Sequence, residues 1–173
     1  MRQCLQKAVE VGDLDALLSF PIIVKGQRNV HETLPFLLYK DLKKRIKENW
    51  LQSPYISGLF QAITDSYKMA SCDWIALTRT VLTPAQFAVW HSEYCQQTGN
   101  QEAENAQANN PVTLSMLLGF GNFDTAEDQA RLNVQAFTQS VQIALRAMKA
   151  MPDPQVKESS SFIIICPGAM EAY

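Results

Sequence analysis

The stretch CDWIALTRTVLTPAQFAVWHSEY, residues 72–94, decides the fold. Its apolar residues recur at intervals of three and four, which is the period of one face of an α-helix, and Trp74 and Trp90 both fall on such a face. Thr83-Pro84 interrupts the pattern with a capping side chain and a proline that suits the first turn of a new helix. The stretch therefore predicts two helices joined at a tight corner, with both tryptophans in the core.

Helical patterns continue on the N-terminal side. Residues 36–50 place apolar side chains at helical spacing and lysines across the other positions, which predicts an amphipathic helix. Ser53-Pro54 has the features of a helix start, and apolar residues at helical spacing follow it. Ser71 or Asp73 begins the helix that carries Trp74. Three short helices with capped joints are expected up to residue 82.

The C-terminal side is helical as well. Residues 96–110, rich in Gln, Asn, Ala and Glu, either extend the preceding helix or form a mobile loop. LSMLLGFGNF (114–123) predicts a short apolar helix ended by Gly119 and Gly121, and Asp124-Thr125 starts a brief acidic helix. A last long helix covers about 133–151 and ends before Pro152. Its predicted buried residues are Val134, Phe137, Val141, Ala144, Leu145 and Met148.

The region before residue 36 has a different character. Residues 2–19 are compatible with a short helix interrupted at Gly12. In PIIVKGQRNVHETLPF (21–36), β-branched residues flank Gly26-Gln27-Arg28-Asn29, which indicates a short β-hairpin with these four residues in its turn. Because two short strands are marginal by themselves, the hairpin needs the rest of the chain to pack against.

Size and composition favour one main domain with tails. A chain of 173 residues with 47% hydrophobic and 18% charged residues can enclose one sizeable core. The net charge of -2 predicts no general affinity for nucleic acid. The four cysteines form neither a zinc-like pair nor a disulfide scaffold, and no apolar run approaches the roughly 18 residues of a membrane span. We expect a cytosolic chain with reduced thiols and no membrane anchor of its own.

No arrangement of side chains points to catalysis or to a metal. His31 and His91 are the only histidines, and neither has a nucleophile or a ligand cluster at a suitable spacing. Cys95 lies one helical turn after His91, but this spacing is too common to indicate thiol catalysis. The glycines of LSMLLGFGNF lack the strand and helix of a dinucleotide fingerprint. We predict no catalytic residues, no metal ligands and no enzymatic activity.

Five strings taken in order carry a family resemblance. They are YKDLKKRI (39–46), SPYISGLFQAI (53–63), the opening stretch, MLLGFGNF (116–123) and QSVQIALRAMKAMPDP (139–154). Together they resemble the capsid N-terminal domain of betaretroviruses and related endogenous elements, over roughly residues 20–152. The resemblance implies an all-α bundle of about six to seven helices with a short N-terminal β-hairpin. It also implies a spacer-like helical segment (1–20), the capsid N-terminal domain (21–152) and a tail without a counterpart in the family (153–173).

The resemblance assigns a role to Phe20-Pro21 and Asp73. Leu18-Ser19-Phe20-Pro21 resembles the junction at which a retroviral protease frees the capsid protein with proline as its new N-terminus. In the family the freed amine pairs with a buried aspartate and secures the hairpin, and Asp73 occupies the matching position. An internal Pro21 has an amide nitrogen without charge or hydrogen, so the pair can form only after cleavage. The alternative is that Pro21 begins a strand and Asp73 caps a helix.

The helix at 36–50 is a candidate polyanion site. Lys40, Lys43, Lys44, Arg45 and Lys47 against Asp41 and Glu48 give 5 - 2 = +3 in a chain of net -2. In assembled capsids the corresponding helix surrounds the hexamer or pentamer axis, where symmetry repeats each lysine into a ring. The resemblance implies that Lys40, Lys43, Lys44 and Lys47 bind an inositol phosphate or a nucleotide in an oligomer. In a monomer the same lysines are a solvated face.

The predicted function is structural. The resemblance implies a self-assembly domain of a truncated, endogenous Gag protein that forms hexamer- or pentamer-like contacts through its N-terminal helices. Its partners would be further copies, related Gag or capsid subunits and host capsid-binding factors. It would reside in the cytoplasm, or in virion-like particles when it assembles with full-length Gag. The alternatives are a co-opted protein that interferes with related retroviruses, and a helical scaffold without a viral role.

Overall fold

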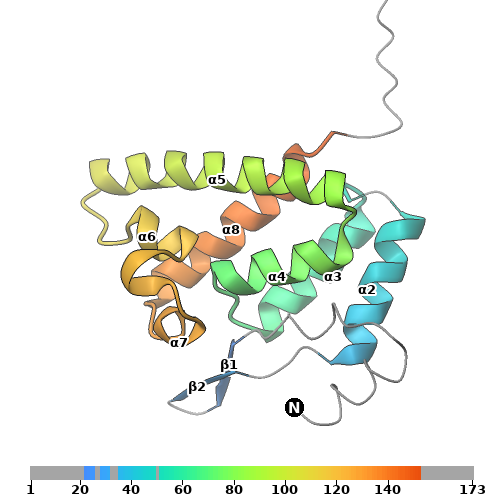
Figure 1. Ribbon diagram of the computed structural model, residues 1–173, viewed down its shortest axis with the longest axis horizontal. Coiled ribbons are helices and arrows are strands. Elements are labelled where there is room, and N and C mark those ends of the chain that lie inside the picture. Colours follow the sequence, from blue (N-terminus) through green and yellow to red (C-terminus); the bar gives the residue numbers. More distant parts are fainter. Residues whose placement is uncertain (1–21, 26–27, 32–34, 50, 153–173) are drawn as a thin grey trace, which may run out of the picture.

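The structure is a computed structural model that describes residues 22–25, 28–31, 35–49 and 51–152 (Figure 1). In this part of the chain a two-stranded hairpin precedes seven α-helices, so the predicted all-α class is confirmed. The elements are β1 (Ile22–Lys25), β2 (Arg28–His31), α2 (Phe36–Glu48), α3 (Pro54–Ser66), α4 (Ser71–Val81), α5 (Pro84–Gln107), α6 (Leu114–Leu118), the 3-10 turn η2 (Gly121–Phe123), α7 (Ala126–Gln129) and α8 (Val134–Ala150).

The hairpin has a shorter connection than the sequence suggested. β1 and β2 pair antiparallel, from Ile22 opposite His31 to Lys25 opposite Arg28. Arg28 and Asn29, which we predicted in the turn, belong to β2. A two-residue connection is the commonest in β-hairpins because its twist suits the paired strands. The predicted turn of four residues was therefore wrong at its last two positions, which belong to the second strand.

The helix starts are confirmed. The side chain of Ser53 accepts a hydrogen bond from the backbone N–H of Ile56, and Pro54 takes the first position of α3. Thr83 caps α5 in the same way through the N–H of Gln86. Such bonds satisfy backbone donors that have no partner within the helix. These local signals divide the chain into the helices that the structure shows.

Residues 96–107 extend α5 as a helix, which resolves the alternative that the sequence left open. One side of this extension is buried, and polar side chains on that side connect it to the rest of the domain by hydrogen bonds. Asn105 is 3% exposed and donates to Gln139 of α8 (2.9 Å) and to the carbonyl of Val112 (2.9 Å). Gln139 returns a hydrogen bond to Asn105 Oδ1 (2.7 Å). The buried amide of Asn105 and the half-buried amide of Gln139 thereby fix the register of α5 on α8.

The core lies where α5 packs along α8, with α4 and α3 beside them (Figure 1). Trp74 and Trp90 are fully buried, as predicted. The ring of Trp90 stacks on Tyr94 at 5.0 Å between centroids, and its Nε1 donates to the carbonyl of Ala144 (3.3 Å). Two large aromatic side chains thereby join α5 to the last helix.

One side of α8 differs from the prediction. Val134 is 66% exposed, and Val141 and Leu145 are only half-buried. Ala136 and Ala147 are fully buried in their place. Small side chains allow α8 to approach α5 closely, whereas a prediction from hydrophobic size favours the larger valines.

A buried glutamine fixes the start of α4. Gln129, at the end of α7, accepts hydrogen bonds from the Ser71 hydroxyl (3.0 Å) and the Cys72 backbone N–H (3.0 Å), and donates to the carbonyl of Phe123 (2.9 Å). Gly119 ends α6 with φ 70°, and a Cβ there would collide with the Gln129 side chain. The close approach and the left-handed backbone both require glycine. This cluster positions the first turn of α4, which contains Asp73.

Candidate functional site

The first candidate site is the carboxyl group of Asp73. Its side chain is 4% exposed, and Oδ2 accepts a 2.9 Å hydrogen bond from the backbone N–H of Ala70, directly before α4. An acceptor in the first helical turn satisfies a donor that the helix leaves unpaired. Among the described residues, no lysine, arginine or histidine forms an ion pair with Asp73. Within the part of the chain that the structure describes, the carboxyl is therefore buried as a helix cap without a cation beside it.

Burial dominates the protonation of this carboxyl. Loss of hydration raises the pKa of Asp73 to about 7, although hydrogen bonds from the Ala70 N–H and the Cys72 thiol act in the opposite direction. Burial also raises the pKa of the Cys72 thiol to about 12, and the negative charge of Asp73 adds to that rise. A cationic group placed beside Asp73 would favour its charged form.

The cleavage-like junction lies beside the described residues. Phe20 and Pro21 are outside them, and β1 begins at the next residue, Ile22. The capping contact of Asp73 with Ala70 is compatible with both roles that we considered for Asp73. The cleavage at Phe20-Pro21 and the later pairing of Pro21 with Asp73 stay predictions.

The second candidate site is the set of lysines on α2. At about 100° per residue, Lys40, Lys43, Lys44 and Lys47 fall on one side of the helix. Lys40 and Lys47 are exposed, and Lys44 lies 3.8 Å from Glu48 with both side chains accessible. The half-buried Lys43 donates a 3.0 Å hydrogen bond to the hydroxyl of Tyr39. We call these four residues the lysine side of α2.

Arg45 does not belong to the lysine side, although our charge count grouped it with the lysines. Its Nε lies 3.3 Å from Asp41 Oδ1 and its Nη1 3.7 Å from Glu48 Oε2. Its guanidinium also lies over the ring of Tyr55 on α3, at 5.7 Å. Asp41, Arg45 and Glu48 therefore form a second group, the acidic side of α2, with a sum of 1 - 2 = -1.

The third candidate site is the outer face of α2 and α3. Leu37 is 73% exposed and Tyr55 48% exposed, so two large apolar side chains face solvent on neighbouring helices. On α3, Gly58 and Ala62 are exposed, and no atom lies within 4 Å of the position that a Cβ on Gly58 would occupy. Exposed apolar groups beside an open strip of small residues suit the close packing of another helix. We call Leu37, Tyr55, Gly58 and Ala62 the outer α2–α3 face.

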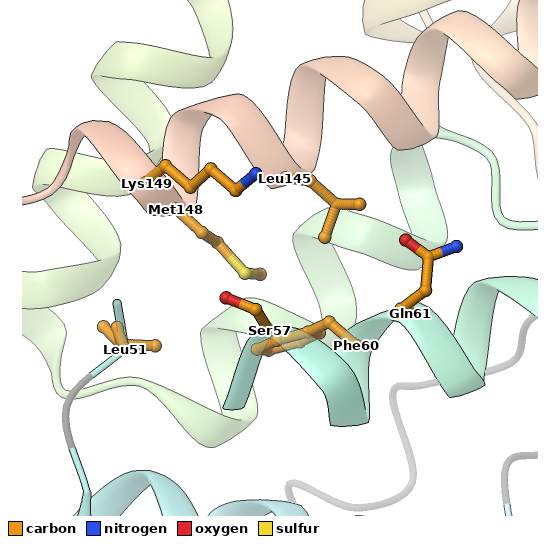
Figure 2. A pocket seen from close by; sticks show the side chains of 7 residues that line it. All are labelled: Leu51, Ser57, Phe60, Gln61, Leu145, Met148 and Lys149. Atoms are coloured by element: carbon orange, nitrogen blue, oxygen red, sulfur yellow. The ribbon is translucent and has the colours of Figure 1, made fainter. Parts of the chain in front are cut away.

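A small cavity of about 60 Å³ lies between α3 and α8 (Figure 2). Figure 2 shows Ser57, Phe60 and Gln61 on α3 opposite Leu145, Met148 and Lys149 on α8, with Leu51 at one end. Nearby, the side-chain amide of Gln52 donates to the carbonyl of Met151 and so connects the α2–α3 joint to the end of α8. The sequence did not reveal this cavity because its two walls are about ninety residues apart. Its volume suits a few atoms only.

His91 and Cys95 lie next to each other on α5, in surroundings that do not favour a reactive thiolate. The Cys95 sulfur lies 3.9 Å from His91 Nδ1, and burial raises the pKa of the thiol, which disfavours the reactive thiolate. The described residues contain no group of three or more metal-ligating side chains. Among α2 to α8, none combines the length and apolar composition of a membrane-spanning helix. The side chain of His31 is outside the described residues.

The structure is a helical domain with a preceding hairpin, which agrees with the fold expected of a capsid N-terminal domain. The comparison with known families agrees. The family described as "gag protein p24 N-terminal domain" matches residues 30–155, more than half of the 173 residues, and this chain belongs to that family.

Gag polyproteins are among its relatives. The chain is 30% identical over 146 residues to the Gag polyprotein of endogenous retrovirus group K member 8 from Homo sapiens, which covers 83% of this chain and 22% of that protein. It is 27% identical over 161 residues to the Gag polyprotein of mouse mammary tumor virus, which covers 90% of this chain and 27% of that protein. The chain thus spans about a quarter of the length of these curated relatives. The predicted betaretrovirus-like resemblance is confirmed.

Proposed function

We propose that this chain is a structural, non-enzymatic capsid domain that assembles with copies of itself and with related Gag subunits through α2 and α3. Membership of the p24 N-terminal domain family supports a capsid role. The observation that carries the proposal is the outer α2–α3 face, where Leu37 is 73% and Tyr55 48% exposed. Burial of such exposed apolar side chains against another protein surface lowers the free energy, because it removes them from water.

The geometry of this face favours helix packing between subunits. At about 100° per residue, Tyr55, Gly58 and Ala62 fall on one exposed side of α3, and Leu37 is exposed on the neighbouring helix α2. No atom lies within 4 Å of the position of a Cβ on Gly58, which leaves room there for a side chain from another subunit. Repetition of this contact about an axis gives the hexamer or pentamer that the family resemblance implies.

Cleavage before Pro21 would add a second element to the proposal. The freed proline ammonium would pair with Asp73, whose buried carboxyl lacks a cationic partner among the described residues. A charge-assisted hydrogen bond in a buried place holds strongly only when both partners are present. The hairpin would thereby become fixed to the start of α4 at the moment of maturation.

The lysine side would give the assembled ring a ligand. Lys40, Lys44 and Lys47 are exposed on one side of α2, and symmetry would multiply their charge around an axis. An inositol phosphate or a nucleotide would bind there. In a monomer the same residues would bind such ligands only weakly, because exposed lysines are well hydrated.

Electron microscopy of the purified protein tests the proposal. Chains beginning at Met1 and at Pro21 are compared with and without inositol hexakisphosphate. Leu37→Ser should abolish rings and tubes, whereas Val89→Ser, at a 40% exposed position on α5, should not. Rings formed equally well by Leu37→Ser, or strict monomers of both chain forms under every condition, would contradict assembly through this face.

The same face supports interference with a related virus as a second candidate function. A copy with an intact outer α2–α3 face could enter the rings of a related Gag protein, or occupy host factors that bind capsids. Co-expression with an intact related Gag separates the two functions. Reduced particle release or infectivity, lost again in Leu37→Ser, supports interference, and unchanged release supports assembly alone. We place this activity in the cytoplasm and in virion-like particles.

A further inference from the structure

The charges of α2 are sorted onto two sides of the helix. The lysine side carries +4, and the acidic side carries -1 because Arg45 opposes only one of its two carboxylates. At about 100° per residue, Leu37 falls between the two sides. Around the exposed part of α2, the lysine side (the positive edge), the apolar side chain of Leu37 and the acidic side (the negative edge) therefore follow one another in this order.

We propose that the lysine side of one copy contacts the acidic side of the next copy, so that copies join head to tail around a ring. The inference rests on the proposed function and specifies which surfaces meet. The lysine side and the acidic side face in different directions on α2. Within one chain they contact each other at their shared border, where Lys44 lies 3.8 Å from Glu48. In a head-to-tail ring each edge meets its opposite on a neighbour.

A second copy is the occupant that accounts for both edges. A polyanion would use the lysine side alone, would leave Asp41 and Glu48 without a role, and would compete with the neighbouring copy for the same lysines. The acidic side adjoins α3 through the contact of Arg45 with Tyr55, so it is continuous with the outer α2–α3 face. The exposed side chain of Leu37 lies between the two edges, and the neighbouring copy would cover it when opposite edges meet. Charge and apolar contact thus describe one interface.

Two charge-reversed chains test the direction of the contact. Variant A carries Lys40→Glu, Lys44→Glu and Lys47→Glu, which changes the lysine side from +4 to -2. It keeps Lys43, which packs on Tyr39. Variant B carries Asp41→Lys and Glu48→Lys, which changes the acidic side from -1 to +3. The control carries Arg79→Glu, Arg131→Glu and Arg146→Glu at exposed positions outside α2, with the same net change as variant A. Circular dichroism confirms that each variant keeps its helices.

Variant A alone and variant B alone should each lose assembly by at least about tenfold, because like charges then meet at every contact. An equimolar mixture should regain assembly, since A and B can alternate with opposite charges at every junction. Alternation requires rings with an even number of subunits, so the mixture should form hexamers and no pentamers. The control should assemble like the wild type. Native mass spectrometry and electron microscopy count the subunits.

Other results overturn the inference in distinguishable ways. If the wild type assembles but the mixture does not recover, the edges do not meet and the proposed function still stands. Recovery as closed dimers would indicate a two-fold contact in place of a head-to-tail one. Assembly of A or B alone at the wild-type level would show that these charges play no part. A wild type that stays monomeric would overturn the proposed function and this inference with it.

Discussion

Replacement of Asp73 by asparagine should change how the stability of the chain depends on pH. In the folded protein burial raises the pKa of Asp73 from 3.8 to about 7. The folded state therefore binds a proton more tightly than the unfolded state. The stabilisation by this proton is complete below pH 4 and is lost as the pH rises through 7.

The size of the effect follows from the shift. About three pKa units at about 1.4 kcal/mol each give an upper limit of about 4 kcal/mol in the free energy of unfolding. The wild-type chain beginning at Met1 should lose up to this amount between pH 4 and pH 8. Asp73→Asn should not lose it, because the amide does not titrate and its oxygen can still accept the Ala70 N–H.

Urea unfolding followed by circular dichroism at several pH values between 4 and 8 measures the difference between the two proteins. Asp65→Asn, an exposed carboxyl on α3, is the matched control and should follow the wild type. A wild-type minus Asp73→Asn difference that is constant across this range would refute the argument from burial. In the chain beginning at Pro21, a free ammonium beside Asp73 should reduce or reverse the pH dependence, because it favours the carboxylate.

Three further substitutions test the packing that positions the candidate sites. Gly119→Ala should lower stability by about 1–3 kcal/mol, because a Cβ collides with Gln129 and φ is 70°, whereas Gly99→Ala, with open space on the α5 helix, should be neutral or stabilising in thermal unfolding. Asn105→Leu should lower the free energy of unfolding, measured in urea, by about 2–3 kcal/mol, because Gln139 and the Val112 carbonyl lose their hydrogen-bond partner. Ala106→Leu, on the exposed side of α5, is the control and should lower it little. Trp90→Phe should lower the free energy of unfolding by about 1–3 kcal/mol, because the hydrogen bond to Ala144 and part of the buried ring area are lost. A loss smaller than about 0.5 kcal/mol would contradict a central place for this ring in the core.

Local signals in the sequence were sufficient for the helices. Ser53 and Thr83 cap the helices that follow them, because a cap depends on residues three positions apart. The end of α6 at Gly119 was predictable for a similar reason, since a left-handed residue after a helix favours glycine. The class of the fold and the burial of both tryptophans follow from spacing within single helices.

Features that depend on distant segments could not be predicted. Whether Val134 or Ala136 is buried depends on how closely α8 approaches α5. Gln129 contacts Ser71 from more than fifty positions away, and no periodic pattern marks such a pair. On α2 a count of charges grouped Arg45 with the lysines, because a sum carries no direction around the helix. The three-dimensional arrangement separates them.

The thiol of Cys72 provides a natural chemical probe of the start of α4. With a pKa of about 12, only about one thiol in ten thousand is ionised at pH 8, so an alkylating reagent should modify it very slowly. Opening of the first turn of α4 would expose the half-buried Cys72 further to water and would speed its modification. The alkylation rate of Cys72 would then report, without any added label, how often this turn opens before and after the chain is cut at Pro21.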